Sequence, residues 1–91
     1  MELSTHLLKA REDKGMTQKQ LADKLGIASA QLISNWERGL CAPPIKKLGN
    51  LASILGIEFD PTFDLVMKYK TEVARQKAAA EIKRPRKGVL R

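Results

Sequence analysis

The stretch from Thr17 to Gly39 predicts two short helices joined by a tight turn, and no other feature of the chain constrains its fold as much. Thr17 and Gln20 form a capping-box pattern, in which a hydroxyl and a side-chain amide satisfy free backbone N–H groups at a helix start. Gly26 ends this helix, because glycine readily adopts the left-handed conformation of a helix C-terminus. Ser29 then caps a second helix over about residues 30–37. Two short helices joined this closely cross at a steep angle.

Three further segments have apolar residues at helical spacing, bounded by glycine or proline. We expect them to form helices over about residues 5–14, from about Pro44 to Leu55, and from Phe63 to about Ala80. No segment requires a strand, and one Trp, one Tyr and two Phe leave a core of Leu, Ile and Ala, which favours helices. The sequence therefore predicts an all-α fold of five helices.

The two short helices predict a helix-turn-helix unit, which presents its second helix to a DNA major groove. With 91 residues the chain has room for one domain with a thin core. We assign residues 1–67 to the helix-turn-helix domain, 68–82 to a C-terminal helical extension and 83–91 to a disordered basic tail. The last assignment rests on Pro85, Gly88 and the adjacent like charges.

The positive charge is concentrated in the C-terminal third. Residues 1–60 contain eight Lys and Arg against seven Asp and Glu, whereas residues 61–91 contain nine against three. These blocks carry net charges of +1 and +6, which together give the formal charge of +7. Such a tail is attracted to nucleic acid or to an anionic membrane, or it is a solvated segment that contributes only solubility.

Several functional classes find no support in the sequence. Cys41 is the only cysteine, so neither an internal disulfide nor a cysteine-based zinc site is expected. His6 is the only histidine and predicts neither a metal site nor a catalytic base. There is no glycine-rich phosphate loop, signal peptide or membrane-spanning segment. We expect a cytoplasmic protein, associated with the nucleoid through DNA, that is not an enzyme and binds no metal or cofactor.

The motif residues resemble one known family. The stretch TQKQLADKLG at residues 17–26, followed by ISNWERG at residues 33–39, is similar to the phage-repressor family. This is the Cro-like, XRE-type class with a lambda-repressor-like five-helix fold, and the resemblance extends over about residues 5–67. Members usually have one apolar residue between the turn glycine and the capping serine. This chain has two, Ile27 and Ala28, so its turn is one residue longer and its recognition helix is expected to be slightly shifted.

The resemblance implies that Ala30, Gln31 and Asn35 face the edges of DNA bases. An amide can donate to N7 and accept from N6 of adenine, so Gln31 and Asn35 are suited to that base. Ala30 has no polar group and can only contact a thymine methyl group or leave room for one. The alternative for Gln31 and Asn35 is a solvated helix face without a partner.

The resemblance also implies contacts with the DNA backbone. Gln18 begins a helix, where the helix dipole independently favours anions, and is expected to bind a phosphate. Such contacts fix register and carry no sequence information. The same role falls to Ser29, Arg38, Lys46 and Lys47, for which solvated surface positions are the alternative.

Two further pairs are expected to be structural or to contact a partner. Arg11 and Glu37 correspond to a partly buried ion pair of the family, and Trp36 is expected in the core. Leu65 and Tyr69 lie on a second face of the last helix. They either contact a dimer partner, or are simply exposed or folded back onto the domain.

Three functions follow from these features. The favoured function is a sequence-specific double-stranded-DNA-binding regulator, a repressor that binds a palindromic operator as a homodimer. The alternative is the antitoxin of a toxin–antitoxin pair, which autoregulates its operon and binds a toxin through its C-terminal region. A third is an adaptor that kept the fold but lost DNA binding.

Overall fold

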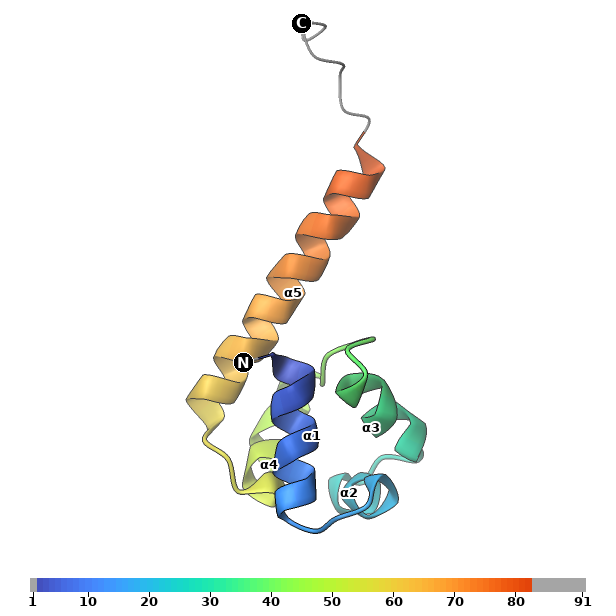
Figure 1. Ribbon diagram of the computed structural model, residues 1–91, viewed down its shortest axis with the longest axis vertical. Coiled ribbons are helices and arrows are strands. Elements are labelled where there is room, and N and C mark those ends of the chain that lie inside the picture. Colours follow the sequence, from blue (N-terminus) through green and yellow to red (C-terminus); the bar gives the residue numbers. More distant parts are fainter. Residues whose placement is uncertain (1, 83–91) are drawn as a thin grey trace, which may run out of the picture.

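The computed structural model describes residues 2–82, and in this range the chain forms helices joined by short loops, with no strand (Figure 1). Its helices are α1 (Leu3–Asp13), α2 (Gln18–Leu25), α3 (Ala30–Glu37), α4 (Ile45–Leu55) and α5 (Phe59–Glu81). The predicted all-α fold of five helices is therefore confirmed. The basic segment 83–91, predicted to be disordered, lies outside the described residues.

The helix-turn-helix has the boundaries that its capping residues predict. Thr17 Oγ1 accepts a hydrogen bond from the Gln20 amide at 3.0 Å, and Gln20 Oε1 accepts one from the Thr17 amide at 2.8 Å. Gly26 ends α2 with a φ of 72°, the left-handed conformation. Ser29 Oγ accepts from the Gln31 amide at 3.0 Å and so caps α3.

Two helices, α1 and α5, begin earlier in the sequence than expected. A third, α4, begins one residue after Pro44, the residue from which it was expected to start. α1 begins at Leu3 instead of about residue 5, which buries Leu3 to 5% exposure. α5 begins at Phe59, four residues before Phe63. Pro61 lies in the first turn of α5, where its missing N–H has no helical acceptor to lose. Pro44 occupies the N-cap position of α4, directly before its first residue Ile45, and makes no side-chain hydrogen bond there.

The core lies where α1, α2, α3 and α4 converge, and the first turns of α5 close it. Trp36 is 2% exposed, so its predicted place in the core is confirmed. Ala22 on α2 is also buried in this core, and α2 packs against both α3 and α4. The largest fully buried apolar side chains are Trp36, Leu21, Ile33, Leu48, Leu51 and Val66.

The second half of α5 extends away from the helices around the core (Figure 1). Every residue from 70 to 82 is exposed, whereas Val66 is fully buried and Tyr69 half-buried. No helix in residues 2–82 is both long enough and apolar enough to cross a membrane. The part of the chain that the structure describes thus combines a packed domain with a projecting helical arm.

Candidate DNA-binding interface

α3 has one buried face and one face turned to solvent. Ile33 and Trp36 are 1% and 2% exposed and anchor the helix to the core. Gln31 is exposed, and Ala30 and Asn35 are half-buried. The three predicted base-contacting side chains therefore lie on accessible positions of a helix whose other side is fixed by packing.

The two amides on this face are hydrogen-bonded to each other. Gln31 Nε2 donates to Asn35 Oδ1 at 3.0 Å, one helical turn further along α3. Ser29, at the N-terminus of the same helix, accepts from the Gln31 backbone amide. Ser29, Gln31 and Asn35 are thus linked along one side of α3, and the link between the two amides was not among the predictions.

Arg11 and Glu37 form a largely buried ion pair that ties α1 to the end of α3. Arg11 Nε and Nη2 donate to the two carboxylate oxygens of Glu37 at 2.6 and 3.0 Å, and their side chains are only 12% and 5% exposed. Arg11 Nη1 also donates to the Met16 carbonyl at 2.6 Å. The hydrogen bond to Glu37 raises the pKa of Arg11, with further support from the charges of Glu37 and Glu12, against the lowering effect of burial.

Gln18, the predicted phosphate contact, also reaches this carboxylate. Its Nε2 donates to Glu37 Oε1 at 2.9 Å, so α2 joins the same network. One hydrogen of Nε2 remains for a phosphate, and that role stays a prediction. The Gln18–Glu37 contact was missed because it joins the start of one helix to the end of the next, which local spacing does not reveal.

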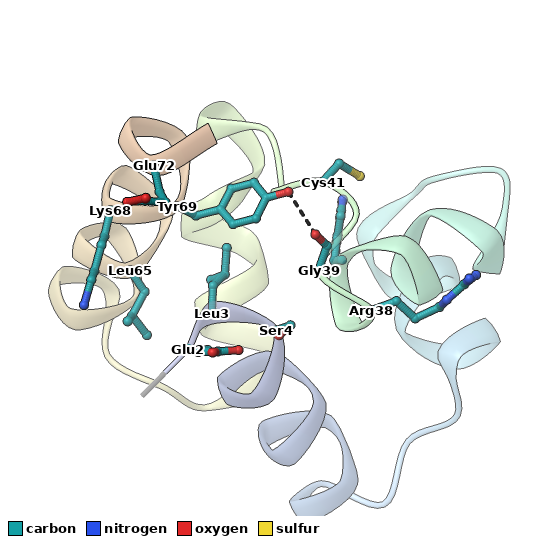
Figure 2. A pocket seen from close by; sticks show the side chains of 11 residues that line it. Glu2, Leu3, Ser4, Arg38, Gly39, Cys41, Leu65, Lys68, Tyr69 and Glu72 are labelled. Atoms are coloured by element: carbon teal, nitrogen blue, oxygen red, sulfur yellow. Dashed lines mark hydrogen bonds between the residues drawn. The ribbon is translucent and has the colours of Figure 1, made fainter. Parts of the chain in front are cut away.

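The three predicted cationic phosphate contacts border the loop that follows α3. Arg38 and Lys46 are exposed, and Lys47 is half-buried in the first turn of α4. No acidic side chain forms an ion pair with them within residues 2–82. Figure 2 shows the Arg38 guanidinium pointing away from Tyr69 and α5. The positive charges are therefore not neutralised locally, as a phosphate-binding surface requires.

Leu65 and Tyr69, the predicted dimer contacts, lie half-buried against the core of their own chain. Tyr69 Oη donates to the Gly39 carbonyl at 3.1 Å and so fixes α5 to the loop after α3 (Figure 2). Both side chains line a groove of about 590 Å³ between the start of α1, this loop and α5. Next to it, Leu40 and Val73 are 59% and 42% exposed and line a smaller groove of about 350 Å³.

Comparison with known proteins agrees with this geometry. Residues 7–61 match the family model described as helix-turn-helix. No curated protein matches the chain. Among solved structures, the clp gene regulator ClgR from Corynebacterium glutamicum has a TM-score of 0.60 and 24% sequence identity, covering 86% of this chain and 83% of its own. This similarity shows a shared fold.

Proposed function

The chain belongs to the XRE-type helix-turn-helix family of DNA-binding regulators, and from this premise we propose that it is a repressor that binds a palindromic operator as a homodimer. Family membership makes it a regulator and not an enzyme. The observation that carries the proposal is the outer face of α3, which presents Gln31 and Asn35 while Ile33 and Trp36 hold the opposite face in the core. We propose Ala30, Gln31 and Asn35 as the base contacts.

Backbone contacts fix the position of α3 in the groove. We assign them to Gln18 and Ser29 at the starts of α2 and α3, and to Arg38, Lys46 and Lys47 around the loop between α3 and α4. The first two lie at helix N-termini, which favour anions. The last three are positive side chains without an acidic partner within residues 2–82. Bound in this way, the protein would be found on the nucleoid in the cytoplasm.

We propose a homodimer because a single helix-turn-helix domain is small. A single recognition helix buries little DNA surface, and a two-fold dimer doubles the contact by reading two half-sites about one DNA turn apart. Leu65 and Tyr69 are half-buried within their own chain, so we extend the proposed dimer surface to the exposed Leu40 and Val73 beside them. These two side chains offer apolar area that a second copy can cover.

Selection of bound DNA from a random pool at fixed, stated salt tests this function. The wild type should select a two-fold-symmetric site, and Gln31→Ala/Asn35→Ala should lose that site while keeping non-specific binding. An asymmetric site, or no site, would contradict the proposal. A reporter gene with the selected site across its promoter then separates repression from activation, because a repressor lowers expression.

The antitoxin alternative is favoured by one observation, the projecting half of α5, where residues 70–82 are exposed throughout. A second small protein could bind along this arm. Purification of the untagged chain from its native host tests this directly. A stoichiometric small enzyme that is lost when residues 70–91 are removed would establish the antitoxin function, and the chain purifying alone would reject it.

A further inference from the structure

The recognition helix α3 and the arm-bearing helix α5 lie on opposite sides of the larger groove. α3 packs mainly against α1 and α2, whereas α5 packs mainly against α4 and α1. Trp36, Arg38 and Gly39 line the groove from the end of α3 and the turn after it, and Leu65 and Tyr69 line it from α5. Direct packing between α3 and α5 therefore contributes little to the distance between them.

One hydrogen bond crosses this groove. Tyr69 extends from α5, and its Oη donates to the Gly39 carbonyl at 3.1 Å (Figure 2). The direction of this bond is fixed, because a carbonyl oxygen can only accept. Within residues 2–82 no other hydrogen bond or ion pair joins α5 to residues 30–44. The Tyr69 hydroxyl is thus the polar link between α5 and the segment that contains α3.

Gly39 belongs to a turn that is itself bonded to the recognition helix. The three consecutive backbone amides of residues 38–40 donate to carbonyls in the last turn of α3. Such bonds make the turn a continuation of the helix end. A bond to the Gly39 carbonyl therefore holds α3 as well as the loop that follows it.

The two exposed residues of the proposed dimer surface lie on the two segments that this bond joins. Leu40 follows Gly39 directly in the chain, and Val73 lies one helical turn after Tyr69 on α5. Both line the smaller groove, together with Tyr69 itself. The Tyr69–Gly39 bond therefore fixes Leu40 relative to Val73, and both of them relative to α3.

We infer that Tyr69 is a positioning residue that sets the spacing between the two half-sites of the operator. In a two-fold dimer, the separation and angle of the recognition helices follow from how each α3 is held relative to the dimer surface. A change of one base pair alters the half-site separation by about 3.4 Å and about 35°. Without the bond, each α3 can move relative to its dimer surface, and the dimer accepts other spacings. This inference rests on the proposed homodimer and names the residue that connects its interface to the recognition helix.

Tyr69→Phe tests this role, because it removes only the hydroxyl and keeps the ring that packs against the core. Binding of the full chain is measured on DNA with the selected half-sites at the selected spacing, one base pair closer and one base pair further apart. The affinity ratio between the selected and the altered spacings should be about 2- to 12-fold smaller for Tyr69→Phe than for the wild type, since one hydrogen bond contributes about 0.5–1.5 kcal/mol. The base preference within each half-site should stay the same.

Thr71→Val, which removes an exposed hydroxyl from the same helix, is the matched control and should keep the wild-type ratio. Circular dichroism melting and sedimentation show that each variant is folded and dimeric. Loss of stability alone would weaken binding at every spacing by the same factor. That result, or a Tyr69→Phe variant that binds as the wild type does, overturns the inference. A wild type that selects no two-fold-symmetric site rejects the proposed function itself.

Discussion

At the scale of single residues, Glu37 connects three helices through one carboxylate. It accepts two hydrogen bonds from Arg11 on α1 and one from Gln18 on α2, and its side chain is 5% exposed. Hydrogen bonds between charged side chains are strong in a buried site when both partners are present. Removal of one partner leaves the other charge buried without a counter-charge. The position of α3 therefore depends on this side chain as well as on apolar packing.

We expect Glu37→Ala to destabilise the fold by about 3–5 kcal/mol, because Arg11 would keep its buried charge without a partner. Asp13→Ala is the control, since it breaks the exposed Lys9–Asp13 pair and should change stability by less than about 1 kcal/mol. Urea unfolding followed by circular dichroism gives both values. Equal effects of the two substitutions would show that the buried pair contributes no more than a surface pair.

His6 makes the stability of the fold depend on pH. Thr62, which is fully buried, donates from Oγ1 to the Glu58 carbonyl at 2.8 Å, so its oxygen accepts from His6 Nε2 at 3.0 Å. Burial, and then the positive charge of the chain's amino terminus, lower the pKa of His6 below 6.5. The unfolded chain therefore binds a proton more readily than the folded chain, and stability is lost as pH falls below about 6.5.

His6→Gln keeps a side-chain donor for Thr62 but removes the titrating ring. Between about pH 7.5 and about pH 5.5, the wild type should lose more unfolding free energy than His6→Gln does. Urea midpoints at several pH values measure both proteins, and the variant corrects for groups that titrate in both. A stability difference that stays constant over this range would contradict the assignment.

At the scale of the helices, local signals predicted those boundaries that carry a capping side chain. Thr17 and Ser29 set the starts of α2 and α3 by accepting from backbone amides two or three positions away, and Gly26 ends α2 in the left-handed conformation. The starts of α1 and α5 were placed too late, because Glu2 and Glu58 cap these helices without a side-chain hydrogen bond. Where α1 and α5 begin is decided instead by which of their first residues are buried, and that burial depends on how the other helices pack.

The candidate DNA-binding site likewise has features that could be predicted from the sequence and features that could not. The positions of Gln31 and Asn35 on α3 could be predicted by counting from the capping Ser29. The bond between their amides, the Gln18–Glu37 contact and the Tyr69–Gly39 contact could not. The first depends on which of several side-chain rotamers is adopted. The other two join residues 19 and 30 positions apart, so they depend on how the helices pack.

Two glycines provide a test of the turn that orients α3. Gly26→Ala should destabilise the domain by about 1–2 kcal/mol, because its φ of 72° strains any residue with a Cβ atom. Gly49→Ala, in the interior of α4 with open space around it, should instead stabilise by about 0.5–1 kcal/mol. Thermal melting measures both, and a stabilising Gly26→Ala would contradict the left-handed turn.

At the scale of the whole molecule, most of the net positive charge follows the helix-turn-helix in the sequence. The first 60 residues are nearly neutral, and the excess of Lys and Arg lies in residues 61–91. Phosphate attraction adds affinity for any DNA sequence, whereas base contacts select the site. The two properties should therefore be separable by truncation.

Removal of residues 83–91, which contain five Lys and Arg, should weaken binding to all DNA sequences alike and reduce the salt dependence of binding. The selected site should stay the same. Fluorescence anisotropy at several salt concentrations measures the slope for the full and the shortened chain, and equal melting temperatures show that the domain is intact. A changed site would mean that the tail reads bases.

The projecting half of α5 also sets a distance. Its residues 70–81 span about 18 Å at 1.5 Å per residue. The arm thus ends about 18 Å from its residue 70, beyond the packed domain. One inserted alanine would lengthen the arm by about 1.5 Å and also turn its far end by about 100° around the helix axis. A change in the length of this helix would therefore alter both how far from the domain the arm ends and the direction in which its last side chains point.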